Sequence, residues 1–130
     1  MSTPVILTVD DSRVLRLSIV ELFRPFACTV LQAAEGLEGL AAVREHRPDL
    51  VLLDYNMPVL DGLGMLRELR ADPAIAATKV IMLTANNAPQ TLAAVARLGV
   101  RDYVTKPHDG PTLLAKAARW VPLVPRETAD

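Results

Sequence analysis

The sequence predicts an α/β fold in which helices cover both faces of a five-stranded, doubly wound parallel sheet. Two observations lead to this prediction. Short apolar runs rich in β-branched residues end abruptly in polar residues, as strands buried on both faces do. Longer amphipathic segments separate these runs, so that strands and helices alternate in a (βα)5 repeat.

Each expected element can be placed on the chain. The strands are expected at 5–9, 28–31, 50–53, 80–83 and 103–104, and the helices around 14–22, 37–43, 63–69, 88–98 and 112–120. Ser12 is expected to cap the first helix, and Gly99 to end the fourth in a left-handed conformation. Pro111 suits the first turn of the fifth helix.

Length and composition indicate one soluble globular domain. Of the 130 residues we expect 1–121 to form the domain and 122–130, which contain two prolines, to be a frayed end or the start of a linker. The net charge of -1 gives no reason to expect binding to nucleic acid or to an anionic membrane. No signal peptide or apolar stretch of about 20 residues is apparent, and the single cysteine excludes an internal disulfide. We therefore expect a cytoplasmic protein.

Polar residues with complementary chemistry follow four of the five predicted strands. Asp10 and Asp11 follow the first strand, Asp54 ends the third, Thr84 follows the fourth and Lys106 the fifth. The carboxyl ends of parallel strands share one edge, where ligands of open α/β sheets bind. Any one of these residues alone would be read as a solvated turn residue. All five at successive strand ends rarely align by chance, which favours a functional site.

Three carboxylates held together repel one another unless a cation lies among them. An open, all-oxygen site suits Mg²⁺ better than zinc or calcium, and Mn²⁺ can substitute. Magnesium also binds phosphoryl oxygens, to which Lys106 would offer a charge and Thr84 a hydroxyl donor. Asp54 is then the residue placed as nucleophile. We expect Lys106 to face solvent and to matter little for folding.

With these residues the sequence resembles the response-regulator receiver domains, the CheY-like family with a flavodoxin-like fold. The matching motifs are Asp10-Asp11-Ser12, Asp54-Tyr55-Asn56-Met57-Pro58 with Asp61-Gly62, Met82-Leu83-Thr84-Ala85, and Asp102-Tyr103-Val104-Thr105-Lys106-Pro107. They cover nearly the whole chain. Two positions depart from the family pattern: Val100 replaces a usual small alanine, and His108 a usual aromatic residue.

The resemblance implies roles for the acidic residues. Asp54 is implied as the phosphoacceptor. Asp11, Asp54 and the backbone carbonyl of Asn56 would ligate Mg²⁺ directly, and Asp10 through water. The phosphoryl group would come from a histidine kinase or a phosphotransfer protein, so the domain would catalyse only its own phosphorylation and dephosphorylation.

The resemblance also implies a conformational switch. Thr84 and Tyr103 would be the switch pair, Ala85 would leave space for the phosphoryl group, and Lys106–Pro107 would be a cis peptide. The output would pass through the face formed by the fourth helix, fifth strand and fifth helix to a downstream protein or a second copy of the chain.

Two other functions are compatible with an acidic site. A Mg²⁺-dependent aspartyl-phosphate phosphatase of the haloacid dehalogenase type carries a second aspartate two residues after its nucleophile on the first strand, but Ser12 stands there. A phosphate-independent binding module would not need the intact set of five residues, and magnesium titration would identify it by a lack of response.

Overall fold

The computed structural model describes residues 3–85, 88–106 and 109–127 and has the predicted alternation of strands and helices. The elements are β1 (Val5–Val9), α1 (Arg13–Phe23), β2 (Thr29–Ala33), α2 (Gly36–His46), β3 (Leu50–Asp54), α3 (Gly62–Ala71), β4 (Val80–Thr84), α4 (Pro89–Arg97), β5 (Asp102–Thr105) and α5 (Gly110–Ala117). Among the described residues, no helix is long and apolar enough to cross a membrane.

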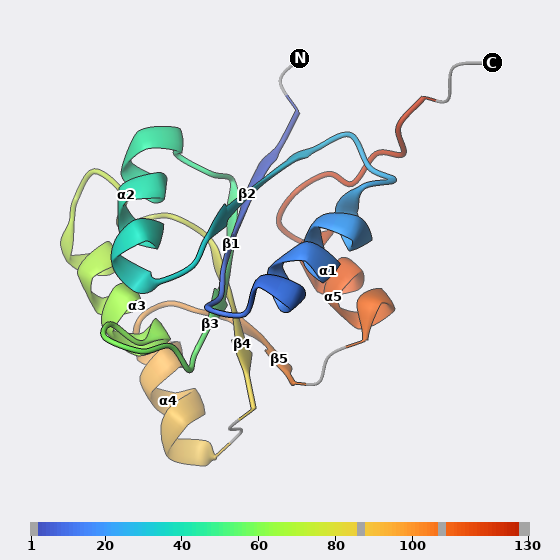
Figure 1. Ribbon diagram of the computed structural model, residues 1–130. Coiled ribbons are helices and arrows are strands. Elements are labelled where there is room, and N and C mark those ends of the chain that lie inside the picture. The colour runs from blue at the N-terminus through green and yellow to red at the C-terminus, as the bar shows by residue number, and fades with distance from the viewer. Residues whose placement is uncertain (1–2, 86–87, 107–108, 128–130) are drawn as a thin grey trace.

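The five strands form one parallel sheet in the order β2-β1-β3-β4-β5 (Figure 1). The chain leaves β1 toward β2 on one side and later returns to β3 on the other side. The order of strands therefore reverses between β1 and β3, and such a reversal opens a crevice at the carboxyl ends of the strands. Val9 of β1 pairs in register with Leu53 of β3, so Asp10 and Asp54 follow at the same level. This confirms the doubly wound parallel fold and the edge predicted for the site.

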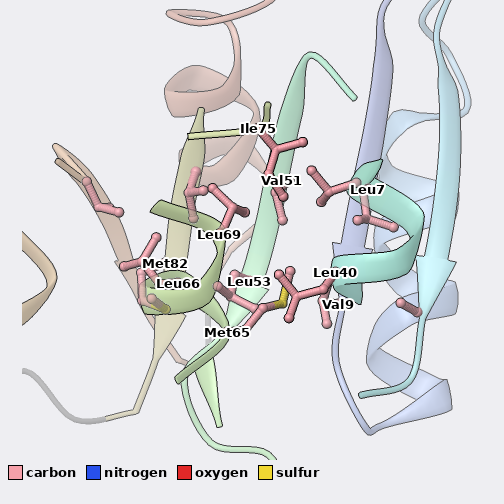
Figure 2. Packing of buried hydrophobic residues seen from close by; sticks show 14 of the residues in the cluster. Leu7, Val9, Leu40, Val51, Leu53, Met65, Leu66, Leu69, Ile75 and Met82 are labelled. Carbon is pink, nitrogen blue, oxygen red and sulfur yellow. The ribbon is translucent and has the colours of Figure 1, made fainter. Parts of the chain in front are cut away.

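Helices cover both faces of the sheet, with α2, α3 and α4 on one side and α1 and α5 on the other (Figure 1). Alternate residues of the inner strands β1, β3 and β4 pack into the two layers, which is why these strands read as nearly continuous apolar runs. Figure 2 shows the larger layer, in which Leu7 and Val51 of the sheet contact residues of α2 and α3 such as Leu40 and Leu69. Val100, which stands where the family usually has alanine, is 5% exposed and packs into this layer. The core therefore accommodates the larger valine side chain.

The predicted start and stop residues act as expected. The Ser12 side chain accepts a hydrogen bond from the backbone N–H of Leu15 at 3.2 Å and caps α1. Gly99 adopts a φ of +80° after α4, and Pro111 lies in the first turn of α5. The bounds of α5 differ most from the prediction, because this helix begins at Gly110 and ends at Ala117, not at residues 112 and 120.

The described part of the C-terminal segment, residues 122–127, is held against the loop between α1 and β2. The N–H of Ala27 donates to the carbonyl of Val124 at 2.7 Å, and the N–H of Arg126 donates to the carbonyl of Pro25 at 2.8 Å. The Arg126 guanidinium also donates to the carbonyl of Arg24 at 2.8 Å. This part of the segment is therefore bound to the domain, since the loop after α1 offers backbone partners that the local sequence does not reveal.

Candidate functional site: an acidic cluster at the carboxyl edge

Three carboxylates meet at the carboxyl ends of β1 and β3. Asp54 is the last residue of β3, and Asp10 and Asp11 directly follow β1. Each offers a carboxylate oxygen within 4.8 Å of the oxygens offered by the other two. Asp10 and Asp54 are only 1% and 2% exposed, whereas Asp11 is open to solvent. The predicted acidic residues are thus brought together, and the side of the cluster at Asp11 is exposed to solvent, so a ligand can enter there.

Lys106 lies between the two buried carboxylates. Its Nζ is 3.0 Å from Asp10 Oδ2 and 2.9 Å from Asp54 Oδ1, and its side chain is only 18% exposed. The expectation that this lysine faces solvent is therefore wrong. Two buried carboxylates attract the ammonium inward before any phosphoryl group is present, and no local pattern around residue 106 records this long-range attraction.

The electrostatics of the cluster follow from this arrangement. Burial raises the pKa of Asp54, and the nearby charge of Asp10 adds to this, although the hydrogen bond from Lys106 opposes both. Burial alone would lower the pKa of Lys106, but its hydrogen bonds to Asp54 and Asp10 outweigh this effect and raise it. One ammonium among three carboxylates leaves an excess of negative charge.

The two buried carboxylates differ in how their oxygens are used. Asp10 has both oxygens engaged, because Oδ1 accepts from the N–H of Ser12 at 2.9 Å and Oδ2 from Lys106. Both hydrogen bonds that Asp54 accepts from described residues fall on Oδ1, from Lys106 and from the N–H of Asn56 at 3.3 Å. Within the described part of the chain, Oδ2 of Asp54 therefore accepts no hydrogen bond.

The other predicted site residues surround this cluster. Thr84 ends β4 and is 1% exposed, and its carbonyl accepts from the N–H of Lys106 at 2.8 Å. Ala85 and Asn56 are exposed. Tyr103 lies on β5 with 38% of its surface exposed. The structure thus places these residues, while their functional roles stay predictions.

Some predictions fall on residues outside the described ranges. These are the cis peptide at Lys106–Pro107 and the departure from the family pattern at His108.

The donor set of the cluster fits a hard divalent cation. All its ligand atoms are carboxylate oxygens, the oxygens lie close enough to share one ion, and the negative excess favours a cation. The exposed side of Asp11 leaves room for water, which Mg²⁺ retains in protein sites. The cluster could therefore hold a metal ion.

Two supporting residues escaped sequence reasoning. Arg16 of α1 donates from Nη1 to the carbonyl of Asp10 at 2.7 Å and so fixes the backbone of the acidic pair. Its place one turn after Ser12 is the only hint in the sequence. The second residue is Gly62, which the sequence analysis noted only as part of a motif. A glycine is needed at this position because a Cβ would collide with the carbonyl of Asp54. Glycine therefore lets α3 begin directly against the end of β3.

The comparisons with known proteins agree with this geometry. The sequence profile of a family described as "Response regulator receiver domain" matches residues 6–118. Protein PilH of Pseudomonas aeruginosa is 38% identical over 109 residues, which span 84% of this chain and 90% of PilH. Other curated relatives are longer, and the chain spans 17% to 46% of their lengths.

Solved structures show the same fold. The chemotaxis protein CheY4 of Vibrio cholerae superposes with a TM-score of 0.86 at 28% identity, over 92% of this chain and 100% of that one. The receiver domain of a sensor histidine kinase from Pseudomonas aeruginosa has a TM-score of 0.81 at 30% identity, over 92% and 98% of the two chains, and its structure has a magnesium ion coordinated in the active site cleft. Receiver domains are signalling modules and not enzymes acting on separate substrates. With its fold, its acidic cluster and a family match over residues 6–118, this chain belongs to the CheY-like response regulator receiver domains.

Proposed function

We propose that the chain is a phosphorylation-dependent switch of a two-component system that accepts a phosphoryl group on Asp54 with the help of Mg²⁺. The family to which it belongs pairs with histidine kinases, which makes a histidine kinase or a phosphotransfer protein the donor. The magnesium ion in the related Pseudomonas receiver domain supports the choice of metal. We further propose that residues 1–121 form the functional unit.

The observation that carries the proposal is the unequal use of the buried carboxylate oxygens. Asp10 has both oxygens hydrogen-bonded, Asp11 is solvated, and Asp54 keeps Oδ2 without a hydrogen bond from any described residue. A nucleophile needs an available lone pair, so Asp54 is the acceptor that the geometry favours. Burial, by raising the pKa of Asp54, also makes its carboxylate more basic than a solvated one.

The transfer then follows from the groups present. Oδ2 of Asp54 attacks the phosphorus of a phosphohistidine, a P–O bond forms, and the P–N bond breaks with the imidazole nitrogen taking up a proton from water. Asp10, Asp11 and Asp54, with the carbonyl of Asn56, would hold Mg²⁺, and the ion would neutralise charge on the phosphoryl oxygens. Lys106, already within the cluster, exchanges a carboxylate partner for a phosphoryl oxygen.

A small phosphodonor such as acetyl phosphate tests the proposal. Intact mass spectrometry should show one phosphoryl addition to the wild type with Mg²⁺ and none with a chelator. Asp54→Asn should abolish the addition, whereas Asp49→Asn, a matched change at an exposed aspartate, should leave it intact. Addition to Asp54→Asn at full yield would refute the assignment.

Phosphorylation is proposed to act on the face formed by α4, β5 and α5. Thr84 ends the strand next to β5, and Tyr103 lies outward on β5. Lys116 holds Tyr103 there, because its Nζ donates to the Tyr103 carbonyl at 2.7 Å and lies 5.4 Å from the ring centroid. Movement of Thr84 toward the phosphoryl group would release Tyr103 inward and change the surface offered to a downstream protein or to a second copy of the chain.

A further inference from the structure

A second cleft lies at the edge of the sheet opposite the acidic cluster, where β4 and β5 begin. It encloses about 650 Å³ and is lined by the ends of α3 and α4, the first residue of β4 and the segment after α5. This volume falls within the roughly 300–1,000 Å³ of small-molecule sites. No part of the proposed phosphoryl transfer uses it.

The cleft concentrates positive charge. Four of its lining side chains are cationic and none is acidic: Arg70, Lys79, Arg97 and Arg101. Lys79, Arg97 and Arg101 are exposed, and none of the three forms an ion pair with another described residue. The whole chain has a net charge of -1, so this surplus is local. The occupant that such a cleft attracts is an anion.

The floor of the cleft is already assembled. Arg70 of α3 donates from Nε to the carbonyl of Leu98 at 2.6 Å, and from Nη1 to the carbonyls of Ala76 and Thr78 at 2.8 and 2.6 Å. One guanidinium thereby ties the end of α4 to the loop that precedes β4. A ligand would meet a preformed surface and would not have to order it.

One wall of the cleft is a fixed aromatic ring. The indole N–H of Trp120 donates to Asp102 Oδ2 at 2.8 Å, and Asp102 is only 7% exposed and also pairs with Arg119 at 3.1 Å. The Nζ of Lys79 lies 5.9 Å from the centroid of the Trp120 ring. A held indole beside cations offers a stacking platform for a planar ring attached to a negatively charged group.

We propose that this cleft binds a nucleoside phosphate, with the phosphates on Arg97, Arg101 and Lys79 and the base on Trp120. An arginine guanidinium can donate two parallel hydrogen bonds to a pair of phosphate oxygens. A planar base would stack on the indole of Trp120, which a site for a simple anion would not need. An acidic peptide would satisfy the cations but would leave the ring without a planar partner.

Trp120 provides the readout, because it is the only tryptophan in the chain. Its fluorescence should change saturably with adenosine or guanosine nucleotides in the absence of divalent metal, with a Kd below about 1 mM. Pyrophosphate, adenosine and a short polyglutamate peptide, measured by calorimetry, should each bind at least about tenfold more weakly. Absence of saturable binding, or equal or tighter binding of pyrophosphate or the peptide, would overturn the proposal.

Charge variants locate the site. Arg97→Gln and Arg101→Gln should each weaken nucleotide binding by at least about fivefold, as loss of one phosphate contact does. Arg67→Gln is the matched control, since Arg67 is exposed on α3 outside the cleft. Asp54→Asn should bind nucleotide like the wild type, which separates this cleft from the phosphorylation site. Equal losses in Arg67→Gln and in the two cleft variants would contradict the assignment.

Discussion

Replacing Lys106 by alanine tests the electrostatics of the acidic cluster, with opposite effects expected on folding and on metal binding. The ammonium lies 2.9 and 3.0 Å from carboxylate oxygens of Asp54 and Asp10, whose side chains are 3% and 1% exposed. Its removal leaves two buried carboxylates without a cationic partner, although each keeps a hydrogen bond from a backbone N–H. Breaking a buried pair in this way costs about 3–5 kcal/mol. We expect a loss near the lower figure, about 3 kcal/mol without metal, because the cluster is open to water beside Asp11.

The same ammonium competes with a bound divalent cation. At about 4 Å and an effective dielectric constant of 20, two like unit charges repel by about 4 kcal/mol. Even a third of this repulsion, about 1.4 kcal/mol, corresponds to a tenfold change in affinity. Lys106→Ala should therefore bind Mg²⁺ at least about tenfold more tightly than the wild type, and saturating Mg²⁺ should restore much of the lost stability.

Urea unfolding with chelator and with saturating Mg²⁺, together with calorimetric titration of Mg²⁺, measures both quantities. Lys79→Ala is the matched control, because Lys79 is exposed and should change the free energy of unfolding by less than about 0.5 kcal/mol. A loss below about 1 kcal/mol in Lys106→Ala without metal, or a weaker affinity for Mg²⁺, would refute the reasoning.

Three further predictions follow from individual residues. Val59 is 90% exposed with a φ of 68°, a strained left-handed conformation for a β-branched residue; Val59→Asn should raise the free energy of unfolding by about 1 kcal/mol in urea, and a decrease would show that no strain is stored there. Burial raises the pKa of Cys28 above 9.0, against the opposing charge of Arg126. The stability due to the neutral thiol is present below pH 9.0 and lost as the pH rises through the folded-state pKa, so in urea unfolding above pH 9.0 the wild type should lose stability faster than Cys28→Ala; parallel profiles would argue against it. Thr84→Ala should still be phosphorylated on Asp54 but should show smaller NMR shift changes across α4, β5 and α5, since one hydrogen bond to a charged oxygen supplies roughly 1.5–3 kcal/mol of the switching energy; shift changes equal to those of the wild type would move the coupling to Lys106 and the metal.

Sequence reasoning reached the fold because local patterns specify it. The inner strands β1, β3 and β4 are nearly continuous apolar runs, and Ser12, Gly99 and Pro111 start or end helices as their chemistry requires. It also reached the acidic cluster, because parallel strands bring Asp10, Asp11 and Asp54 to one edge whatever the details of packing. Both predictions follow from sequence periodicity and topology.

What sequence reasoning missed are long-range contacts. The inward pairing of Lys106 depends on two carboxylates that are 96 and 52 residues away along the chain. The segment around Arg126 bonds to the loop around Arg24, which is 102 residues away. The indole of Trp120, expected to end the last helix, lies after it and donates to the buried Asp102. No repeat or motif joins such partners, so only the folded structure reveals them.

The central claim is that Asp54 alone carries the phosphoryl group. Borohydride reduces an acyl phosphate to an alcohol, so an aspartyl phosphate becomes homoserine at the residue that held it. Peptide mapping after treatment with phosphodonor, Mg²⁺ and borohydride should find homoserine at position 54 and aspartate at positions 10 and 11. Homoserine at position 10 or 11 with unchanged Asp54, or no homoserine in a protein that had gained a phosphoryl mass, would contradict the account.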